Sequence, residues 1–306
     1  MRVLVVGAGA TGGAFGTRLQ EAGREVTYLV RPRRAEVLRR DGIRFVAPDG
    51  DRTHLVRAES TLTSYQPYDL VVIAVKAPGL EQALATAADG IGSDTVVLPF
   101  LNGMDHLDVL RRRWPGQVLG GLVEIVATVD DTGAVVQMTP LCGMTVGTLD
   151  GSPLPPRVAG ILDVPGADLT VAADIVGRLW EKWVFIAAAG VVTCLLRNDI
   201  GSILAAGGEG HIRQAVAETE AVARAAGHPV GEASHAQSLE LLIEPGSSFT
   251  SSLYRDLQHG RAQEAEHILG ALAARADALG VETPLLDLTL VQIRAQHLST
   301  AAAGAQ

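Results

Sequence analysis

Residues 3–16 of the chain read VLVVGAGATGGAFG, in which a short apolar run leads through a glycine-rich turn into a helical pattern. Gly7, Gly9 and Gly12 fit the spacing G-x-G-x-x-G at this strand-to-helix turn. In such a turn the first glycine permits a tight bend, the second lets the backbone approach a pyrophosphate, and the third allows close helix packing. The unpaired N–H groups at the helix N-terminus favour phosphate. The stretch therefore predicts a dinucleotide-binding α/β domain.

The second apolar run, EVTYLV over residues 25–30, ends at an arginine where such folds usually carry an acidic residue. An acid accepts a hydrogen bond from the ribose 2′-hydroxyl of NAD, whereas an arginine can bind the 2′-phosphate of NADP. Arg31 therefore predicts NADP(H) as the cofactor. Arg33 and Arg34 follow in sequence, and a solvated basic loop is an equally good interpretation of these two residues.

Two further apolar runs, DLVVIAVKA (69–77) and DTVVLPFLNG (94–103), predict strands buried on both faces of a parallel sheet. The carboxyl ends of such strands form the ligand-binding edge of an open α/β sheet. Lys76 and Asn102 stand at these ends. We predict that Lys76 contacts the cofactor and that Asn102 contacts the nicotinamide ribose or the substrate. A surface lysine and a plain Asn-Gly turn are the competing interpretations.

The middle of the chain predicts a hairpin and then a domain boundary. GQVLGGLVEIVATVDDTGAVVQM (116–138) alternates about the turn DDTG, which is typical of an antiparallel hairpin appended to the sheet. The Pro- and Gly-rich segment 150–166 is the best candidate for the boundary. We assign residues 1–170 to an N-terminal domain with a Rossmann-type doubly wound sheet and residues 171–306 to an all-helical C-terminal domain.

The C-terminal half shows helical patterns with little strand signal. The predicted helices cover residues 170–196, 209–227, 230–243 and 262–280. The last nine residues, LSTAAAGAQ, predict a frayed tail.

Composition excludes several classes of function. A formal charge of −9 and an aromatic content of 4% argue against a nucleic-acid partner. The N-terminal apolar run breaks at glycine after five or six residues, too short for a signal peptide or membrane span, so we expect a cytoplasmic protein. Cys142 and Cys194 lack metal or redox spacing and predict buried small hydrophobes. The eight histidines form no metal-binding motif, so we predict no metal.

Six stretches occur in an order that resembles the ketopantoate reductase family: GAGATGG, VRP, VKA, LNGM, LWEKW and SSLYRDLQHGRAQEAEHILG. The resemblance covers most of the chain. It implies an N-terminal Rossmann domain, a C-terminal all-helical domain, a homodimer, and NADPH-dependent reduction of 2-dehydropantoate to (R)-pantoate in pantothenate and coenzyme A biosynthesis.

The resemblance also assigns roles to three residues of the C-terminal half. Lys182, in LWEKW, matches the family's catalytic lysine, and an ammonium there can stabilise the alkoxide formed from a 2-oxo acid and donate a proton. Without the resemblance, a snorkelling surface lysine would be an equal interpretation. Glu264 matches the glutamate that contacts the substrate hydroxyl near the lysine, and Ser252 matches the serine that binds the substrate carboxylate. Glu266 is expected to be a structural polar residue.

One departure from the family bears on the substrate. Members commonly carry asparagines four and eight residues after the lysine, where this chain has Ile186 and Gly190. Losing two amides changes the polar groups of a pocket and therefore its substrate choice. A paralogue that reduces another 2-oxo acid or carbonyl compound is one alternative, and a nonenzymatic NADP-binding redox sensor is an alternative of another class.

The predicted site residues fall into three groups. The catalytic residues are Lys182 and Glu264, and the substrate-binding residues are Asn102 and Ser252. The residues predicted to bind NADP(H) are Gly7, Ala8, Gly9, Ala10, Thr11, Gly12, Arg31, Lys76 and Asn102.

Overall fold

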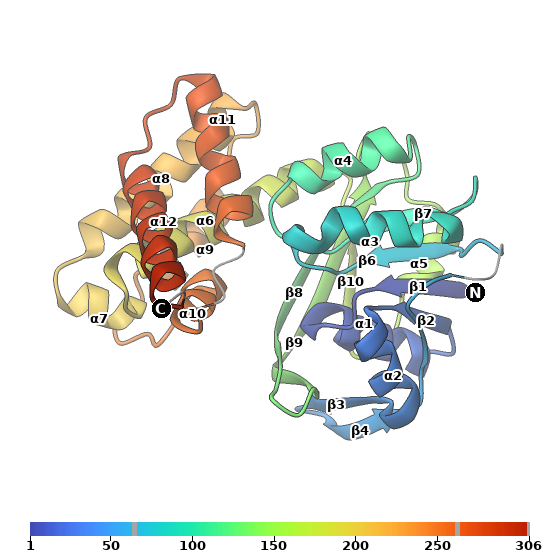
Figure 1. Ribbon diagram of the computed structural model, residues 1–306. Coiled ribbons are helices and arrows are strands. Elements are labelled where there is room, and N and C mark those ends of the chain that lie inside the picture. The colour runs from blue at the N-terminus through green and yellow to red at the C-terminus, as the bar shows by residue number, and fades with distance from the viewer. Residues whose placement is uncertain (63–65, 261–263, 305–306) are drawn as a thin grey trace. The chain divides into compact units, whose positions relative to one another are not determined.

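The structure is a computed structural model that describes residues 1–62, 66–260 and 264–304, with side chains described as far as residue 299 (Figure 1). The chain folds into two compact units. Unit 1 holds Met1–Leu101 and His106–Val176, and unit 2 holds Asn102–Asp105 and Gly177–Gln306. The boundary predicted after residue 170 thus lies six residues before Val176, where the chain passes from unit 1 to unit 2 for the last time. The short stretch Asn102–Asp105 also belongs to unit 2.

Unit 1 contains the predicted parallel sheet, whose strand order is β5-β2-β1-β6-β7. Its strands are β1 (Arg2–Val6), β2 (Glu25–Leu29), β5 (Arg57–Glu59), β6 (Leu70–Ile73) and β7 (Val96–Pro99). All neighbouring pairs are parallel. Since the chain leaves β1 toward β2 on one side and reaches β6 on the other, the order reverses at β1 and β6, where doubly wound sheets bind their ligands. The predicted Rossmann-type fold is confirmed.

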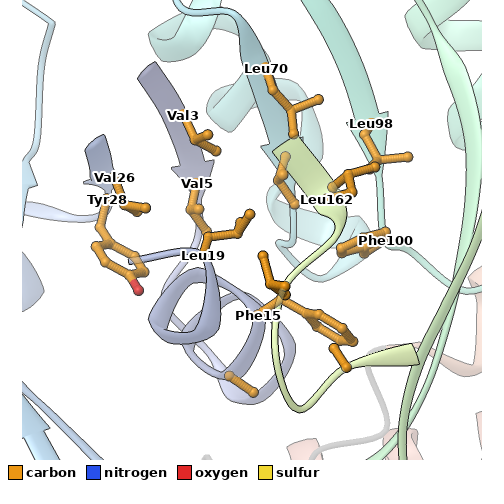
Figure 2. Close-up of a cluster of buried hydrophobic side chains, with 14 of the residues drawn as sticks. Val3, Val5, Phe15, Leu19, Val26, Tyr28, Leu70, Leu98, Phe100 and Leu162 are labelled. Atoms are coloured by element: carbon orange, nitrogen blue, oxygen red, sulfur yellow. The ribbon is translucent and has the colours of Figure 1, made fainter. Parts of the chain in front are cut away.

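The helices of unit 1 cover the sheet with apolar side chains. They are α1 (Ala10–Glu21), α2 (Pro32–Asp41), α3 (Leu80–Ala87), α4 (Asp105–Arg113) and α5 (Pro156–Leu162), with 3-10 turns at Ala77–Gly79 and Ala88–Gly90. Figure 2 shows Phe15 and Leu19 of α1 packed with Val3 and Val5 of β1 and with Leu162. Because α5 buries its apolar side chains in this core, the Pro- and Gly-rich segment 150–166 is part of unit 1 and not a linker.

The predicted hairpin forms, but it belongs to a second sheet. β8 (Leu119–Val129) and β9 (Val135–Thr148) pair antiparallel. They join β3 (Ile43–Ala47), β4 (Gly50–His54) and β10 (Asp168–Val171) in a sheet of order β10-β9-β3-β4, with β8 beside β9. The sequence did not predict β3, β4 and β10, nor β5 of the first sheet. Since β10 pairs with β9, the helix predicted from residue 170 begins only at Ile175.

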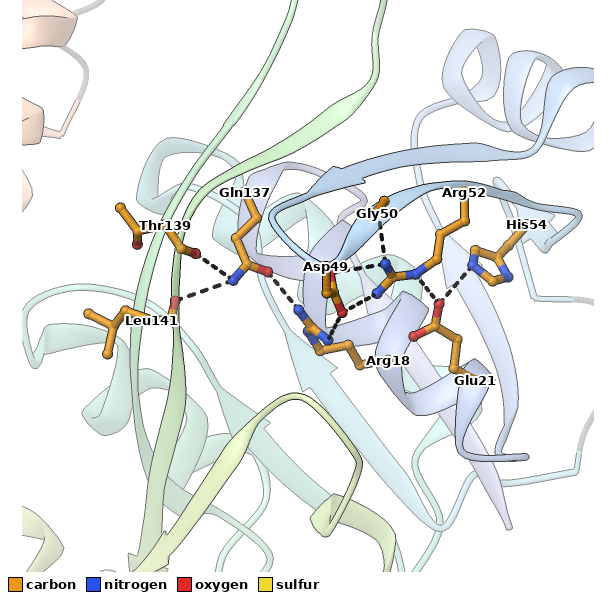
Figure 3. A network of polar contacts seen from close by, with 9 residues as sticks. All are labelled: Arg18, Glu21, Asp49, Gly50, Arg52, His54, Gln137, Thr139 and Leu141. Carbon is orange, nitrogen blue, oxygen red and sulfur yellow. Dashed lines mark hydrogen bonds and ion pairs between the residues drawn. The ribbon is translucent and has the colours of Figure 1, made fainter.

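A polar network anchors α1 to this second sheet (Figure 3). Arg18 is 3% exposed and donates a hydrogen bond of 2.8 Å from its guanidinium to the side-chain oxygen of Gln137 on β9. Its other amino group lies 3.7 Å from the carboxylate of Asp49. Arg52 of β4 donates to Asp49 at 3.0 Å, holds the pKa of that carboxyl below its usual value, and reaches Glu21 at the end of α1. The network fixes the helix that begins at the glycine turn.

Among its described residues, unit 2 contains helices and no strand. Its helices are α6 (Ile175–Leu196), α7 (Ile200–Ala205), α8 (Glu209–Ala225), α9 (Glu232–Leu242), α10 (Ser252–Gln258), α11 (Ala271–Leu279) and α12 (Pro284–Gly304). A π-helical turn, Glu266–Gly270, precedes α11, so the helix predicted over 262–280 is divided in two, and residues 262–263 lie outside the described residues. The predicted tail is wrong as far as Gly304, because α12 continues to that residue. The predicted all-helical C-terminal domain is confirmed.

The long helix α6 is the core of unit 2. It is long and apolar enough to cross a membrane, but 67% of its most apolar window is buried inside the protein, as in the core helix of a folded domain. Trp180 and Trp183 are both buried, and their rings lie 5.0 Å apart. Trp180 also stacks on His228 with ring centres 5.5 Å apart. The two tryptophans therefore serve packing within unit 2.

Candidate active site

The glycine turn has the geometry that a bound dinucleotide requires. Gly7 has a φ of +99°, and a Cβ atom there would lie 2.9 Å from the carbonyl oxygen of Ala74. A Cβ atom on Gly12 would clash with the carbonyl oxygen of Gly7, so the helix approaches the turn as closely as its backbone allows. A Cβ atom on Gly9 would meet nothing within 4 Å. The first and third glycines are thus required by the protein's own packing, whereas Gly9 leaves open space at the N-cap of α1.

This N-terminus of α1 also offers backbone donors. Gly13 donates its N–H to the carbonyl oxygen of Gly9 at 2.8 Å, which closes the first turn. The N–H groups of Ala10, Thr11 and Gly12 precede this bond and have no intrahelical acceptor. Within the described part of the chain no side chain caps Gly9. Backbone donors beside open space can hold a pyrophosphate, so the turn fits the predicted cofactor.

Arg31 and Lys76 follow the carboxyl ends of two strands of the parallel sheet. Arg31 comes two residues after β2, is exposed, and is the N-cap residue of α2. Lys76 comes three residues after β6 and is exposed at the start of the 3-10 turn. Ala8 is buried beneath the glycine turn. Since β2 and β6 flank β1, the two cations and the turn after β1 share one edge of the sheet.

The arginines of the loop separate into two kinds. Arg34 is half-buried and donates a 3.0 Å hydrogen bond to the carbonyl oxygen of Gly133 in the β8–β9 turn, and its burial lowers its pKa. Arg31 and Arg33 are exposed. Arg34 therefore serves the structure of unit 1, while Arg31 and Arg33 have side chains in solvent that can reach a ligand.

The catalytic candidate Lys182 lies on α6 and is half-buried. The next residue, Trp183, donates its indole N–H to the carbonyl oxygen of Ile268 at 2.9 Å. Ile268 in turn donates its backbone N–H to the carbonyl oxygen of Glu264 at 3.0 Å. Two hydrogen bonds therefore connect the backbone of Glu264 with the turn of α6 that carries Lys182. π-helical turns such as Glu266–Gly270 occur frequently at functional sites.

The stretch that contains Asn102 contacts the same part of unit 2. Gly103 has a φ of +77°, and a Cβ atom there would lie 3.3 Å from the carbonyl oxygen of His267. Arg275 binds the carboxylate of Asp105, and its guanidinium lies 4.8 Å from the centre of the Trp183 ring. Asn102, Lys182 and Glu264 therefore come from three separate stretches that meet in one region of unit 2.

Ser252, the predicted carboxylate ligand, is exposed at the first position of α10, and its neighbour Ser251 holds it there. Ser251 is 5% exposed and accepts the backbone N–H of Tyr254 at 3.0 Å. Its hydroxyl lies 2.7 Å from that of Thr193 on α6, and Thr193 donates to the carbonyl oxygen of Ala189 at 2.6 Å. Because each hydroxyl has one proton, Ser251 donates to Thr193. This chain of hydrogen bonds attaches α10 to α6.

Several other predictions concern residues outside these contacts. Cys142 and Cys194 are both free and buried, as predicted, and burial raises the pKa of the Cys194 thiol to about 12. Glu266 forms a two-bond ion pair with Arg294, each bond 2.7 Å long, which agrees with the predicted structural role. No group of three or more metal-ligating side chains occurs among the described residues.

Comparisons with known proteins agree with this arrangement. Residues 3–151 match the family described as ketopantoate reductase PanE/ApbA, and residues 174–297 match the family described as ketopantoate reductase PanE/ApbA C terminal. The chain belongs to the ketopantoate reductase family. Within this family it is 30% identical to an uncharacterized oxidoreductase, YkpB, of Bacillus subtilis over 96% of this chain and 98% of that protein. It is 28% identical to the 2-dehydropantoate 2-reductase of Archaeoglobus fulgidus over 92% of each chain.

Solved structures show the same fold. A PanE/ApbA family ketopantoate reductase from Ralstonia eutropha superposes with a TM-score of 0.88 at 24% identity and covers 98% of this chain and 99% of its own. A D-mandelate dehydrogenase in complex with NADH and anilino(oxo)acetate superposes with the same TM-score, 0.88, at 21% identity, with 98% and 99% covered. These likenesses show the fold, and by the family models this chain is an oxidoreductase of the ketopantoate reductase family.

Sequence reasoning missed the residues that support the site. Thr193 and Ser251 attach α10 to α6, and Arg275 connects the stretch of Asn102 with Trp183. The run TSS before a helical pattern is a recognisable N-cap signal for Ser251. No local signal distinguishes Arg275 from a surface arginine, since its partners Asp105 and Trp183 are distant in sequence.

Proposed function

We propose that this protein is an NADP(H)-dependent reductase that converts the carbonyl at C2 of a 2-oxo acid into the hydroxyl of the 2-hydroxy acid. The observation that supports the proposal is the meeting in unit 2 of the stretches that carry Lys182, Glu264 and Asn102, in a chain whose unit 1 presents an open glycine turn. Lys76 and Arg31 stand at the edge of that turn's sheet. A protein that only senses the cofactor has no need of the three groups in unit 2.

Three side chains of the protein take part in the proposed reaction. When bound, the nicotinamide supplies a hydride for the carbonyl carbon. The ammonium of Lys182 stabilises the negative charge that develops on the carbonyl oxygen and donates the proton that completes the hydroxyl. Glu264 accepts a hydrogen bond from that hydroxyl. Ser252 donates a hydrogen bond to the carboxylate and orients the substrate.

The preference for NADPH is proposed from Arg31. Its guanidinium follows β2, where the adenosine ribose lies in dinucleotide-binding sheets, and can bind a 2′-phosphate with two hydrogen bonds. Charge-assisted hydrogen bonds contribute about 1.5–3 kcal/mol, which corresponds to roughly 10- to 100-fold in affinity. We therefore expect Arg31→Asp to reduce the ratio of NADPH to NADH efficiency by this factor. Arg33→Ala, in the same exposed loop, is the matched control and should leave the ratio within a factor of about three.

The first experiment follows the oxidation of NADPH by the purified protein in the presence of 2-oxo acids, with NADH in parallel. 2-Dehydropantoate, the substrate in the names of several relatives, is the first compound of the panel. Turnover of one or more 2-oxo acids with NADPH is the expected result. Tight binding of NADPH without turnover of any 2-oxo acid would contradict the proposal and favour a nonenzymatic sensor.

A further inference from the structure

The face of α6 that carries Lys182 continues along the helix for three turns. Positions 182, 186, 190 and 193 follow one another at spacings of four, four and three residues, so these side chains share one face. At 1.5 Å per residue, Lys182 and Thr193 are about 16 Å apart along the axis. Thr193, at the far end, is hydrogen-bonded to Ser251, which directly precedes the proposed carboxylate ligand. This face of α6 therefore links Lys182 with the start of the helix that carries Ser252.

The middle of this face is filled by leucine side chains. A Cβ atom on Gly190 would lie 2.7 Å from the Cδ1 atom of Leu253 and 3.5 Å from the Cδ2 atom of Leu269. Leu253 is 4% exposed and Leu269 is fully buried. The space beside Gly190, where any other residue would place its side chain, is therefore occupied by methyl groups. Methyl groups neither donate nor accept hydrogen bonds, so this position offers no polar contact.

The neighbouring turn of α6 is apolar as well. Ile186, one turn after Lys182, is half-buried. Phe185 beside it contacts the ring of Phe249, with ring centres 6.3 Å apart. Polar side chains thus stand at the two ends of the face, at Lys182 and at the Thr193–Ser251 pair, while the residues between them are hydrocarbon.

We infer that the 2-oxo acid carries an apolar side chain, branched or aromatic, and that Ile186 and Gly190 with Leu253 over it select against a hydroxyl on that side chain. This inference rests on the proposed function, because it takes Lys182 to bind the C2 oxygen. A hydroxyl placed against this wall loses its hydrogen bonds to water and gains none from the protein. The preferred substrate therefore lacks a hydroxyl like the 4-hydroxyl of 2-dehydropantoate.

A matched pair of substrates separates the two possibilities. 3,3-Dimethyl-2-oxobutanoate and 2-dehydropantoate have the same carbon skeleton and differ only in the 4-hydroxyl. An apolar pocket disfavours an added hydroxyl by up to about 100-fold, whereas a site built to bind that hydroxyl rejects the analogue without it by about 10⁴- to 10⁵-fold. We expect the kcat/KM of the intact protein with NADPH to be at least about tenfold higher for 3,3-dimethyl-2-oxobutanoate.

Variants of the α6 face test which residues set the choice between the two substrates. Ile186→Asn introduces an amide one turn from Lys182, and we expect it to shift the kcat/KM ratio at least about tenfold toward 2-dehydropantoate. The double variant Gly190→Asn with Leu253→Ala gives the amide the space that Leu253 now fills, and should shift the ratio in the same direction. Leu196→Asn changes an exposed leucine of the same helix beyond Thr193, 42% exposed, and is the control that should leave the ratio unchanged.

The outcomes distinguish failure of this inference from failure of the proposed function. Turnover of both substrates with equal efficiency, or with a preference for 2-dehydropantoate, would overturn the inference and leave the 2-oxo acid reductase intact. An unchanged ratio in Ile186→Asn and in the double variant would overturn the assignment of the selecting residues. Absence of turnover with both substrates and with aromatic 2-oxo acids would overturn the proposed function and this inference with it.

Discussion

The glycine turn of unit 1 and the Lys182 face of unit 2 are built in different ways. In the turn, backbone atoms form the site: Gly12 lies against the carbonyl oxygen of Gly7, and the donors are N–H groups at the start of α1. On the α6 face, side chains form it, and they come from stretches as far apart in sequence as Thr193 and Ser251. The first site is local in sequence, and the second exists only after the helices have packed.

This difference has a consequence for variation. A backbone site tolerates almost no side chain at its glycines, whatever the substrate, because the constraint is steric. A side-chain site can exchange individual groups while the fold persists, as Ile186 and Gly190 show on a helix that keeps Lys182. Substitution of the tightly packed Gly7 or Gly12 should therefore abolish cofactor binding, whereas substitutions on the α6 face should change substrate choice in steps.

The largest expected effect is on catalysis in unit 2. Lys182→Ala removes the proposed proton donor, so we expect kcat to fall by about 10²- to 10⁴-fold, while NADPH binding should be unchanged. Steady-state kinetics and a fluorescence titration with NADPH measure the two quantities. Arg178→Ala, one turn earlier on α6, changes an exposed arginine paired with the half-buried Glu181, and is the control that should keep full turnover. Wild-type kcat in Lys182→Ala would remove the catalytic assignment.

The two glycines of unit 1 should separate packing from ligand contact. Gly12→Ala places its Cβ against the carbonyl oxygen of Gly7, so we expect the free energy of unfolding to fall by about 1–3 kcal/mol and NADPH binding to be lost. In Gly9→Ala the Cβ atom meets no protein atom, so the stability should be unchanged while NADPH affinity falls at least about tenfold. Denaturant unfolding with and without NADPH measures both. Equal affinities of Gly9→Ala and wild type would show that the pyrophosphate binds elsewhere.

The adjacent serines of unit 2 should also differ. Ser251→Ala removes the N-cap of α10 and the hydrogen bond to Thr193, so we expect a loss of about 1–2 kcal/mol in the free energy of unfolding. Ser252→Ala alters an exposed hydroxyl and should leave stability unchanged while raising the KM for the 2-oxo acid. Thermal unfolding and KM measurements on both variants test this. The reverse pattern would exchange the roles of the two residues.

The smallest effect concerns the ion pair between Glu266 and Arg294. The hydrogen bonds from Arg294 lower the pKa of Glu266 in the folded state, so the pair stabilises the protein above the ordinary glutamate pKa of 4.5 and loses this contribution as the pH falls through the lowered value. Both side chains are more than half exposed, so Glu266→Gln should cost at most about 1 kcal/mol at neutral pH. Urea unfolding between pH 3 and pH 7 should show the difference from wild type vanish at the acid end. A difference that grows on acidification would contradict this assignment.

Much of unit 1 was predictable because its elements carry local signals. The strands at residues 70–73 and 96–99 are continuous apolar runs, the strands at residues 2–6 and 25–29 are rich in apolar residues, and Gly23 and the glycine turn mark the ends of α1. The second sheet was not predicted, although the Asp-Gly pair at residues 49–50 between two short strands is a hairpin signal. β10 could not be found locally, since its four residues are strand only because β9 pairs with them.

The sequence by itself determined the fold of the glycine turn in unit 1 and the identity of the candidate groups in unit 2. These features depend on residues that are neighbours in the chain, so the sequence pattern shows them directly. They are the tight glycine turn, the glycine N-cap of α1 and the arginine after β2. Only the tertiary structure decided which α6 residues face Leu253, how Ser251 attaches α10, and how Asn102 and Glu264 approach the same helix. These features depend on contacts between residues distant in the chain, and the free energy of such contacts is set by packing that no single stretch contains.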